Sequence, residues 1–170
     1  MAGAREIVAV SRGNSKQSLA KQFGATEYVS SEGLEAEGSS VEKYLLERFP
    51  GGLEYAFECV GNEQIMTTAL KILAPNGRLA LVGAPPAGTE LRYPVELLLP
   101  GRSVVGGFLG CVDPEVGFGE LVKMYGSKGE NDFSAQVDAM VTHRFRLEQI
   151  NEAFGLLKSG GCIRSLIVFD

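Results

Sequence analysis

The sequence predicts an α/β protein: a truncated Rossmann-like, doubly wound parallel sheet of about five to six strands. Three observations carry this prediction. Short apolar runs recur along the chain, amphipathic stretches with helical spacing separate them, and glycine, proline or asparagine marks many boundaries. Strands that alternate with helices in this way favour parallel pairing, with helices on both faces of the sheet. At 170 residues we expect a single domain over 1–170.

The first half of the chain contains three expected strands and three expected helices. Asn14 or Ser15 is expected to cap the first helix and Asn62 the third, because their side chains accept hydrogen bonds from free backbone N–H groups. Gly24 is expected to end the first helix. The polar segment 30–40 is expected to be a surface loop. The strands cover residues 6–10, 26–30 and 53–61, and the helices cover 15–23, 41–49 and 62–73.

The second half is expected to continue the same alternation. A turn at residues 74–78 leads to the fourth strand, and a proline-rich loop follows that strand. The last strand is either part of the single domain or an appendage to it. The expected strands cover 79–84, 103–110 and 163–169, and two helices are expected around Phe118–Tyr125 and Leu147–Lys158.

Composition narrows the classes of function. The net charge is −5, which argues against non-specific binding to nucleic acid or to an anionic membrane surface. No apolar run approaches the roughly 20 residues of a membrane span. The first ten residues contain Arg5 and Glu6, where a signal peptide needs an apolar stretch. We therefore expect neither nucleic acid nor a membrane as a partner.

The metal-ligating residue types are few and scattered. The chain has one histidine, and its three cysteines form no C-x-x-C pair. This spacing does not favour a zinc site, and it fits reduced thiols in a cytoplasmic protein. The residues concerned are His143, Cys59, Cys111 and Cys162.

In a doubly wound sheet, ligands bind beyond the carboxyl ends of the strands. The loops after the first, third and fourth expected strands are therefore the candidate site. They cover residues 11–16, 59–63 and 82–86. A small-molecule ligand is the expected partner of this crevice.

Several motifs recur in the order found in one known family. The stretches 2–29, 53–86, 97–110 and 144–169, with the motifs SRGNSK, FECVGN and LVGAPP, resemble zinc-type alcohol dehydrogenases of the medium-chain dehydrogenase/reductase superfamily. The resemblance covers only the C-terminal nucleotide-binding domain. It includes neither the catalytic domain that supplies zinc ligands in that family nor the first Rossmann strand with its G-x-G-x-x-G turn.

The resemblance implies the strand order 3-2-1-4-5-6, in which the family's first strand is central. Without that strand, two inner edges would be left unpaired, which is costly where their backbone groups are buried. We therefore expect the strand at 6–10 to pair directly with that at 53–61, giving the flavodoxin-like order 2-1-3-4-5. The alternative is that a partner chain supplies a strand.

The resemblance also implies an NADP(H)-type site. Ser11 and Arg12 stand where an NAD-binding protein carries an acid, and Lys16 adds a further donor. Ordinary surface residues in a turn are the alternative interpretation. In the family, the segment that Cys59, Val60 and Gly61 match lies near the adenosine. The segment that Val82, Gly83 and Ala84 match lies near the nicotinamide, and for both segments the alternative is a strand end that needs glycine to turn. The residue that Arg164 matches reaches the pyrophosphate, and an exposed arginine in an ion pair is the alternative for Arg164.

Catalytic residues are not assigned by the sequence. His143, Glu58 and Asp113 are weak candidates for acid–base work, and surface or core roles are the alternatives for each. Cys59 and Cys111 are more typical of small apolar residues than of nucleophiles, because no basic partner is apparent.

The segment 103–110 is apolar, and the corresponding strand of the family is an edge that pairs across a two-fold axis. We therefore expect a homodimer through residues 103–110. The function favoured overall is an alcohol dehydrogenase-like oxidoreductase-family protein with an NADP(H)-type nucleotide-binding remnant. Whether it catalyses hydride transfer by itself stays open. The alternatives are a non-redox isomerase, cyclase or dehydratase that uses the vacated cleft, and a dimeric binding or scaffold module.

Overall fold

The computed structural model describes residues 3–127 and 133–169, which fall into two compact units. The first unit covers Gly3–Cys111, and the second covers residues 112–169. The single domain expected from the sequence stays a prediction. The α/β class is confirmed, because strands alternate with helices along the chain and every strand pair is parallel.

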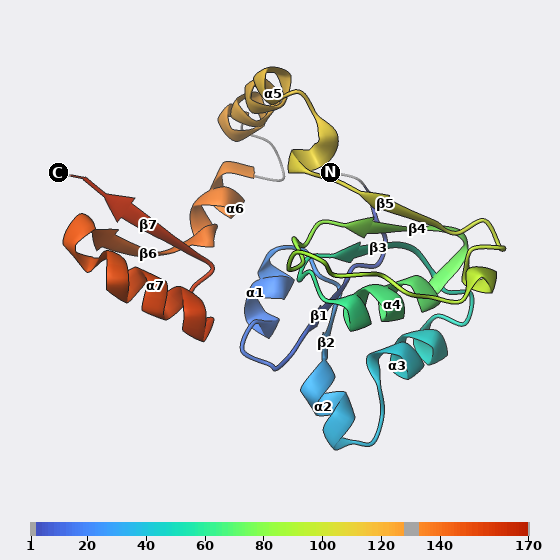
Figure 1. The fold of residues 1–170 in the computed structure, drawn as a ribbon. Coiled ribbons are helices and arrows are strands. Elements are labelled where there is room, and N and C mark those ends of the chain that lie inside the picture. The colour runs from blue at the N-terminus through green and yellow to red at the C-terminus, as the bar shows by residue number, and fades with distance from the viewer. Residues whose placement is uncertain (1–2, 128–132, 170) are drawn as a thin grey trace. The chain divides into compact units, whose positions relative to one another are not determined.

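The first unit contains two parallel sheets (Figure 1). β1 (Val8–Ser11) pairs with β2 (Glu27–Ser30). In the other sheet, β4 (Leu73–Leu81) lies between β3 (Leu53–Glu58) and β5 (Ser103–Gly106). β4 begins at Leu73, earlier than the expected strand at 79–84. Leu73 pairs with Leu53 of β3, and a register shift separates this pair from the pairing of Tyr55 with Arg78. β5 ends at Gly106, so the expected strand over 103–110 is too long.

Helices follow most of these strands. α4 lies along one face of β3 and β4 (Figure 1), and its apolar face supplies Ala69 and Leu70 to a core that Leu73 and Leu79 complete. The expected cap of this helix is confirmed, since Asn62 Oδ1 accepts hydrogen bonds from two backbone N–H groups of its first turn. The helices of this unit are α1 (Gln17–Gln22), α2 (Ser31–Ala36), α3 (Val41–Arg48) and α4 (Glu63–Lys71), with 3₁₀ turns at Val95–Leu97 and Leu109–Cys111.

Two local expectations about helices are wrong. The N-cap of α1 is Lys16, without a side-chain hydrogen bond, so neither Asn14 nor Ser15 caps the helix through its side chain. The segment 30–40 contains α2 instead of being a loop throughout. Ser30 Oγ accepts a hydrogen bond from the Gly33 N–H at 3.1 Å, and this cap nucleates a short helix in a polar sequence.

The predicted strand order 2-1-3-4-5 is also wrong. β1 pairs with β2 alone, and β3 pairs with β4 alone, so the sheet is not closed between β1 and β3. The argument for closure assumed that the two inner edges would be buried. They carry accessible residues instead: Val10 on β1 is 46% exposed and Phe57 on β3 is 69% exposed. Water can satisfy backbone groups at such edges, so closure is not required. A strand from a partner chain stays a prediction.

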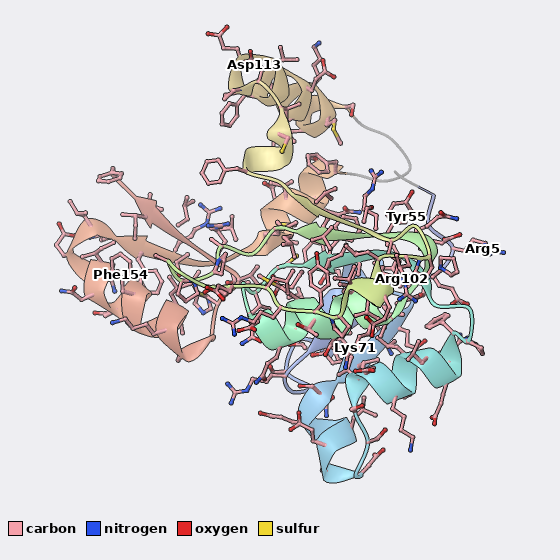
Figure 2. The ribbon with its side chains drawn as sticks, turned by 45° about the vertical axis from the view of Figure 1, so that its right-hand side comes forward. Arg5, Tyr55, Lys71, Arg102, Asp113 and Phe154 are labelled. Atoms are coloured by element: carbon pink, nitrogen blue, oxygen red, sulfur yellow. The ribbon has the colours of Figure 1, made fainter. Side chains whose placement is uncertain are left out.

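Helix α3 connects the two sheets through charged side chains. Arg48 forms ion pairs with Glu6, next to β1, and with Glu27 of β2, both at 3.5 Å. Near the other end of the helix, Glu42 Oε2 lies 3.1 Å from Nζ of Lys71 on α4. Lys71 is labelled in Figure 2. Ion pairs of α3 therefore link the two sheets where their strands do not pair.

The second unit has its own two-stranded sheet. β6 (Val141–Arg146) pairs in parallel with β7 (Arg164–Val168), and α7 (Ile150–Ser159) connects them. The expected helix at Leu147–Lys158 begins as a 3₁₀ turn and continues as α7. Neither β6 nor the helix just before it was predicted from the sequence. The remaining helices are α5 (Pro114–Gly126) and α6 (Phe133–Met140). Within residues 3–127 and 133–169, no helix combines the length and apolar character that crossing a bilayer requires.

Candidate nucleotide-binding site

The loops after β3 and β4 pack backbone against backbone. A Cβ atom built on Gly61 would lie 2.6 Å from the Ala84 carbonyl oxygen, and the positive φ of Gly61, +82°, is itself typical of glycine. Only residues without a side chain allow so close an approach. The structure thus brings together six of the predicted site residues, namely Cys59, Val60, Gly61, Val82, Gly83 and Ala84.

Glu58, the last residue of β3, holds this pair of loops. Its backbone carbonyl accepts hydrogen bonds from the N–H groups of Val82 and Gly83 at 2.8 and 2.9 Å. Its carboxylate accepts hydrogen bonds from the N–H groups of Val60 and Gly61. The side chain is 1% exposed. These contacts give Glu58 a structural role and leave its predicted acid–base role without support.

The outer surface of the loops is apolar. Val60 is 68% exposed and Val82 is 56% exposed, so both can contact a flat, uncharged part of a ligand. Partial burial of the Cys59 thiol raises its pKa, and the nearby charge of Glu58 raises it further. The thiol is therefore protonated at neutral pH, which weakens it as a nucleophile.

The turn after β1 carries the predicted phosphate donors. The Arg12 side chain is 89% exposed, and its Nε donates to Glu32 Oε1 at 3.1 Å. β2 holds the backbone of the turn, since Ser30 Oγ donates to the Arg12 carbonyl oxygen at 3.0 Å and the Tyr28 hydroxyl donates to the Gly13 carbonyl oxygen. The turn thus has an ordered backbone and an exposed guanidinium that pairs with Glu32.

The two groups of predicted residues share the first unit but are not bonded to each other. Within the described part of the chain, no hydrogen bond or ion pair joins residues 11–16 to the loops at 59–61 and 82–84. Arg164 belongs to β7 in the second unit.

His143 and Asp113 also lie in the second unit, and each has local contacts. The Nδ1 atom of His143 lies 3.0 Å from Thr142 Oγ1, and its ring stacks with Phe145. Asp113, labelled in Figure 2, caps α5 by accepting a hydrogen bond from the Glu115 N–H at 2.9 Å. Helix capping explains Asp113 without a catalytic role.

Two surface hollows of the structure lie away from these loops. One is lined by Glu54, Tyr55 and residues 75–77, at the start of β3, and another by residues 146–148 with Val168 and Phe169. Neither contains a residue of the loops at 11–16, 59–61 or 82–84. These two hollows therefore give no support to a vacated cleft, on which the isomerase, cyclase or dehydratase alternative depends.

Comparison with known proteins decides the family. A family model described as zinc-binding dehydrogenase matches residues 1–124. The chain belongs to the zinc-binding dehydrogenase family. The geraniol dehydrogenase of Carpoglyphus lactis is 39% identical over 166 residues, and the S-(hydroxymethyl)glutathione dehydrogenase of Komagataella pastoris is 35% identical. These alignments cover 98% and 97% of this chain but only 42% of each relative, so the chain spans less than half their length.

Solved structures of dehydrogenases show the same fold. The benzyl alcohol dehydrogenase of Acinetobacter calcoaceticus matches 99% of this chain and 44% of its own, with a TM-score of 0.83 and 27% identity. A zinc-binding dehydrogenase from Sinorhizobium meliloti, solved with bound NADP, matches with a TM-score of 0.75 and 20% identity, which supports the fold alone. The resemblance to the C-terminal nucleotide-binding domain of alcohol dehydrogenases is thus confirmed.

The residues present do not fit the zinc of the family name. Tetrahedral zinc sites use three or four cysteine, histidine or carboxylate ligands. Across residues 3–127 and 133–169, no three such side chains gather closely enough to hold a metal ion. Arg12 instead offers an exposed guanidinium, and the loops after β3 and β4 pack closely through their glycines.

Sequence reasoning missed one residue of this site, Glu32, and the role of another, Glu58. Glu32, which pairs with Arg12, lies in the segment 30–40, for which the sequence predicts a loop. An acid just after an expected strand was the signal that could have indicated this ion pair. For Glu58, the sequence predicts a weak acid–base candidate with a surface or core role as the alternative, and it does not predict these backbone contacts. The spacing of Glu58 was the available signal for these contacts, because Glu58 stands three residues before Gly61 and four before Asn62, the cap of α4.

Proposed function

We propose that this chain is the NADP(H)-type nucleotide-binding domain of an alcohol dehydrogenase-like oxidoreductase. Membership of the zinc-binding dehydrogenase family supports the oxidoreductase class. The preference for a 2′-phosphate rests on one observation, the exposed guanidinium of Arg12 at the end of β1. An acid at this position would accept hydrogen bonds from the ribose hydroxyls and repel a 2′-phosphate, whereas Ser11 and Arg12 supply donors.

The ion pair between Arg12 and Glu32 is compatible with this proposal. The two side chains are 89% and 57% exposed, and an ion pair so open to solvent is worth only about 0–1 kcal/mol. A phosphate dianion offers the guanidinium a stronger, bidentate contact. The 2′-phosphate can therefore displace Glu32 at little cost.

The test is a fluorescence titration of the purified 170-residue protein with NADPH and with NADH. We expect tighter binding of NADPH than of NADH. In R12A we expect the ratio of the affinities for NADPH and NADH to fall roughly tenfold. E32Q is expected to strengthen NADPH binding, because it frees Arg12. Absence of detectable NADPH binding at millimolar cofactor would end the proposal.

Arg92 provides a matched control. It is also an exposed arginine of the first unit that pairs with a glutamate, Glu90. R92A should leave the affinity for both cofactors unchanged. An equal loss in R92A and R12A would mean that general charge, and not the turn after β1, attracts the cofactor.

We also propose that two copies pair through residues 103–110. β5 is an edge strand of its sheet, and Val105 on it is 38% exposed. An apolar edge strand favours pairing with another strand. A stable dimer that does not bind NADPH would favour the scaffold alternative. A cytoplasmic location remains an expectation from the cysteines.

A further inference from the structure

Glu58 is a buried carboxylate whose partners are backbone amides. Oε1 accepts hydrogen bonds from the N–H groups of Val60 at 2.8 Å and Gly61 at 2.9 Å, and Oε2 accepts from Gly61 at 2.9 Å. The Asn62 N–H lies 3.5 Å from Oε1. In the part of the chain that the structure describes, no lysine, arginine or histidine forms an ion pair with this carboxylate. Backbone amides therefore provide the hydrogen bonds that a buried charge requires.

These three amides belong to consecutive residues that lead into α4. Asn62 is the N-cap of this nine-residue helix. Consecutive N–H groups that converge at a helix N-terminus attract anions, because they combine free donors with the positive end of the helix dipole. The left-handed conformation of Gly61 contributes to this convergence. The place where an anion would bind is already filled by a side chain that is 1% exposed.

We propose that Glu58 is a built-in occupant of the amide group at residues 60–62, and that it thereby makes the loop after β3 selective against phosphate. The carboxylate satisfies the donors that a phosphate would need. The surface left for a ligand consists of Val60 and the exposed part of Cys59, which suits an uncharged group. Glu58 is thus a positioning residue, since it acts on a ligand through the loop. The selectivity does not depend on whether NADPH is the ligand.

The geometry explains why the residue is glutamate. Both oxygens accept a hydrogen bond from Gly61, so glutamine would place an NH₂ donor against an N–H donor at about the same distance. Alanine would remove the acceptors and leave buried N–H groups unsatisfied, which costs much more than the loss of an exposed contact. A small soluble carboxylate could then enter the vacated space and replace the missing side-chain group.

The experiment is chemical rescue of E58A by formate, followed by thermal unfolding. We expect E58A to unfold about 5–10 °C below the wild type, and sodium formate at roughly 100 mM to recover a substantial part of that loss. Sodium chloride at the same ionic strength should not. Wild type should show no formate-specific shift, because its site is filled.

Two control variants separate the carboxylate site from general effects. L79A removes a fully buried side chain of the same unit and should lose stability without rescue by formate. E54A removes an exposed carboxylate of the same strand and should unfold like the wild type. Rescue of L79A to the same extent as E58A, or no formate effect on folded E58A, would overturn the proposal.

E58Q keeps the proposal testable if E58A does not fold. In this variant we expect hydrogen exchange at the amides of Val60 and Gly61 to be about tenfold faster than in the wild type. Inorganic phosphate should shift the NMR signals of these two amides in E58A or E58Q and leave them unchanged in the wild type. Unchanged exchange in E58Q, or a phosphate-dependent shift in the wild type, would contradict the proposal. None of these measurements uses NADPH, so they stand apart from the test of the proposed function.

Discussion

Gly83 lies so close to Gly61 that a Cβ atom on Gly83 would be 2.2 Å from the Gly61 amide nitrogen. No real Cβ atom tolerates that distance, so any side chain at position 83 would push the loops after β3 and β4 apart. The same Gly61 N–H donates to the Glu58 carboxylate. One glycine contact thus determines both the spacing of the loops and the geometry of a buried acceptor.

The first prediction follows directly. G83A should lower the free energy of unfolding by roughly 1–3 kcal/mol, because the added methyl group meets backbone atoms that cannot rotate away. Urea denaturation measures the change. G51A is the matched control, since Gly51 has open space around its Cα and an ordinary φ, and it should differ from wild type by no more than about 0.5 kcal/mol. Equal stability of G83A and G51A would show that the loops can separate.

The second prediction concerns stability at high pH. The Tyr44 hydroxyl donates to Glu27 Oε1, and this hydrogen bond is the main cause that raises the pKa of Tyr44 above its ordinary value of 10.0. Partial burial and the charge of Glu27 act in the same direction. As the pH rises past 10, the unfolded chain loses this proton first, so the contribution of Tyr44 to stability is present below pH 10 and declines above it.

Urea denaturation at pH 8 and pH 11 measures this decline. Y44F should be less stable than the wild type at pH 8, and the difference between them should shrink at pH 11. Y55F is the control, since Tyr55 is 64% exposed, and it should follow the wild type at both values. A difference between Y44F and wild type that does not vary with pH would contradict the assignment.

The third prediction concerns Cys59. Because its pKa is raised by burial and by Glu58, the thiol should react with iodoacetamide more slowly in the folded protein than in the urea-unfolded chain at pH 8. The folded rate should approach the unfolded rate as the pH increases. Mass spectrometry of the labelled peptide gives both rates. Equally fast labelling in both states at pH 8 would show that the folded environment does not protect the thiol.

The fourth prediction tests the proposed dimer. V105K places a charge on the edge strand β5, which should prevent strand pairing between two copies. Light scattering after size exclusion should give a dimer for the wild type and a monomer for V105K, with unchanged circular dichroism. V95K is the control, because Val95 is exposed in a 3₁₀ turn outside the strand. A wild-type monomer at all concentrations, or a V105K dimer, would exclude this interface.

Local sequence signals predicted local structure well where one signal dominates. Asn62 caps α4 as expected, and Gly24 follows α1 with φ at +94°. The family resemblance was also recognisable, because several motifs recur in register. Ser30 shows the limit of such signals. A polar segment with several serines and glycines fits a loop and a short capped helix equally well, and one hydrogen bond decides between them.

Long-range pairing could not be predicted in the same way. The direct pairing of β1 with β3 was inferred from the cost of buried unpaired edges, but the sequence does not reveal whether an edge is buried. Phe57 is an apolar strand residue and is nevertheless 69% exposed. The role of Glu58 depends on two loops meeting, and only the fold shows that Gly61 and Gly83 touch.

The missing pairing between β1 and β3 has a consequence for how the first unit unfolds. Cooperative unfolding spreads through shared hydrogen-bond ladders and shared apolar cores, and here the ladder is interrupted. The β1–β2 ladder contains one buried side chain, Val29, whereas Leu73 and Leu79 of β4 are almost fully buried. The two ladders should therefore unfold as separate cooperative units, β1–β2 first. Native-state hydrogen exchange in increasing urea should give one isotherm for the amides of β1–β2 and another for those of β3–β4–β5.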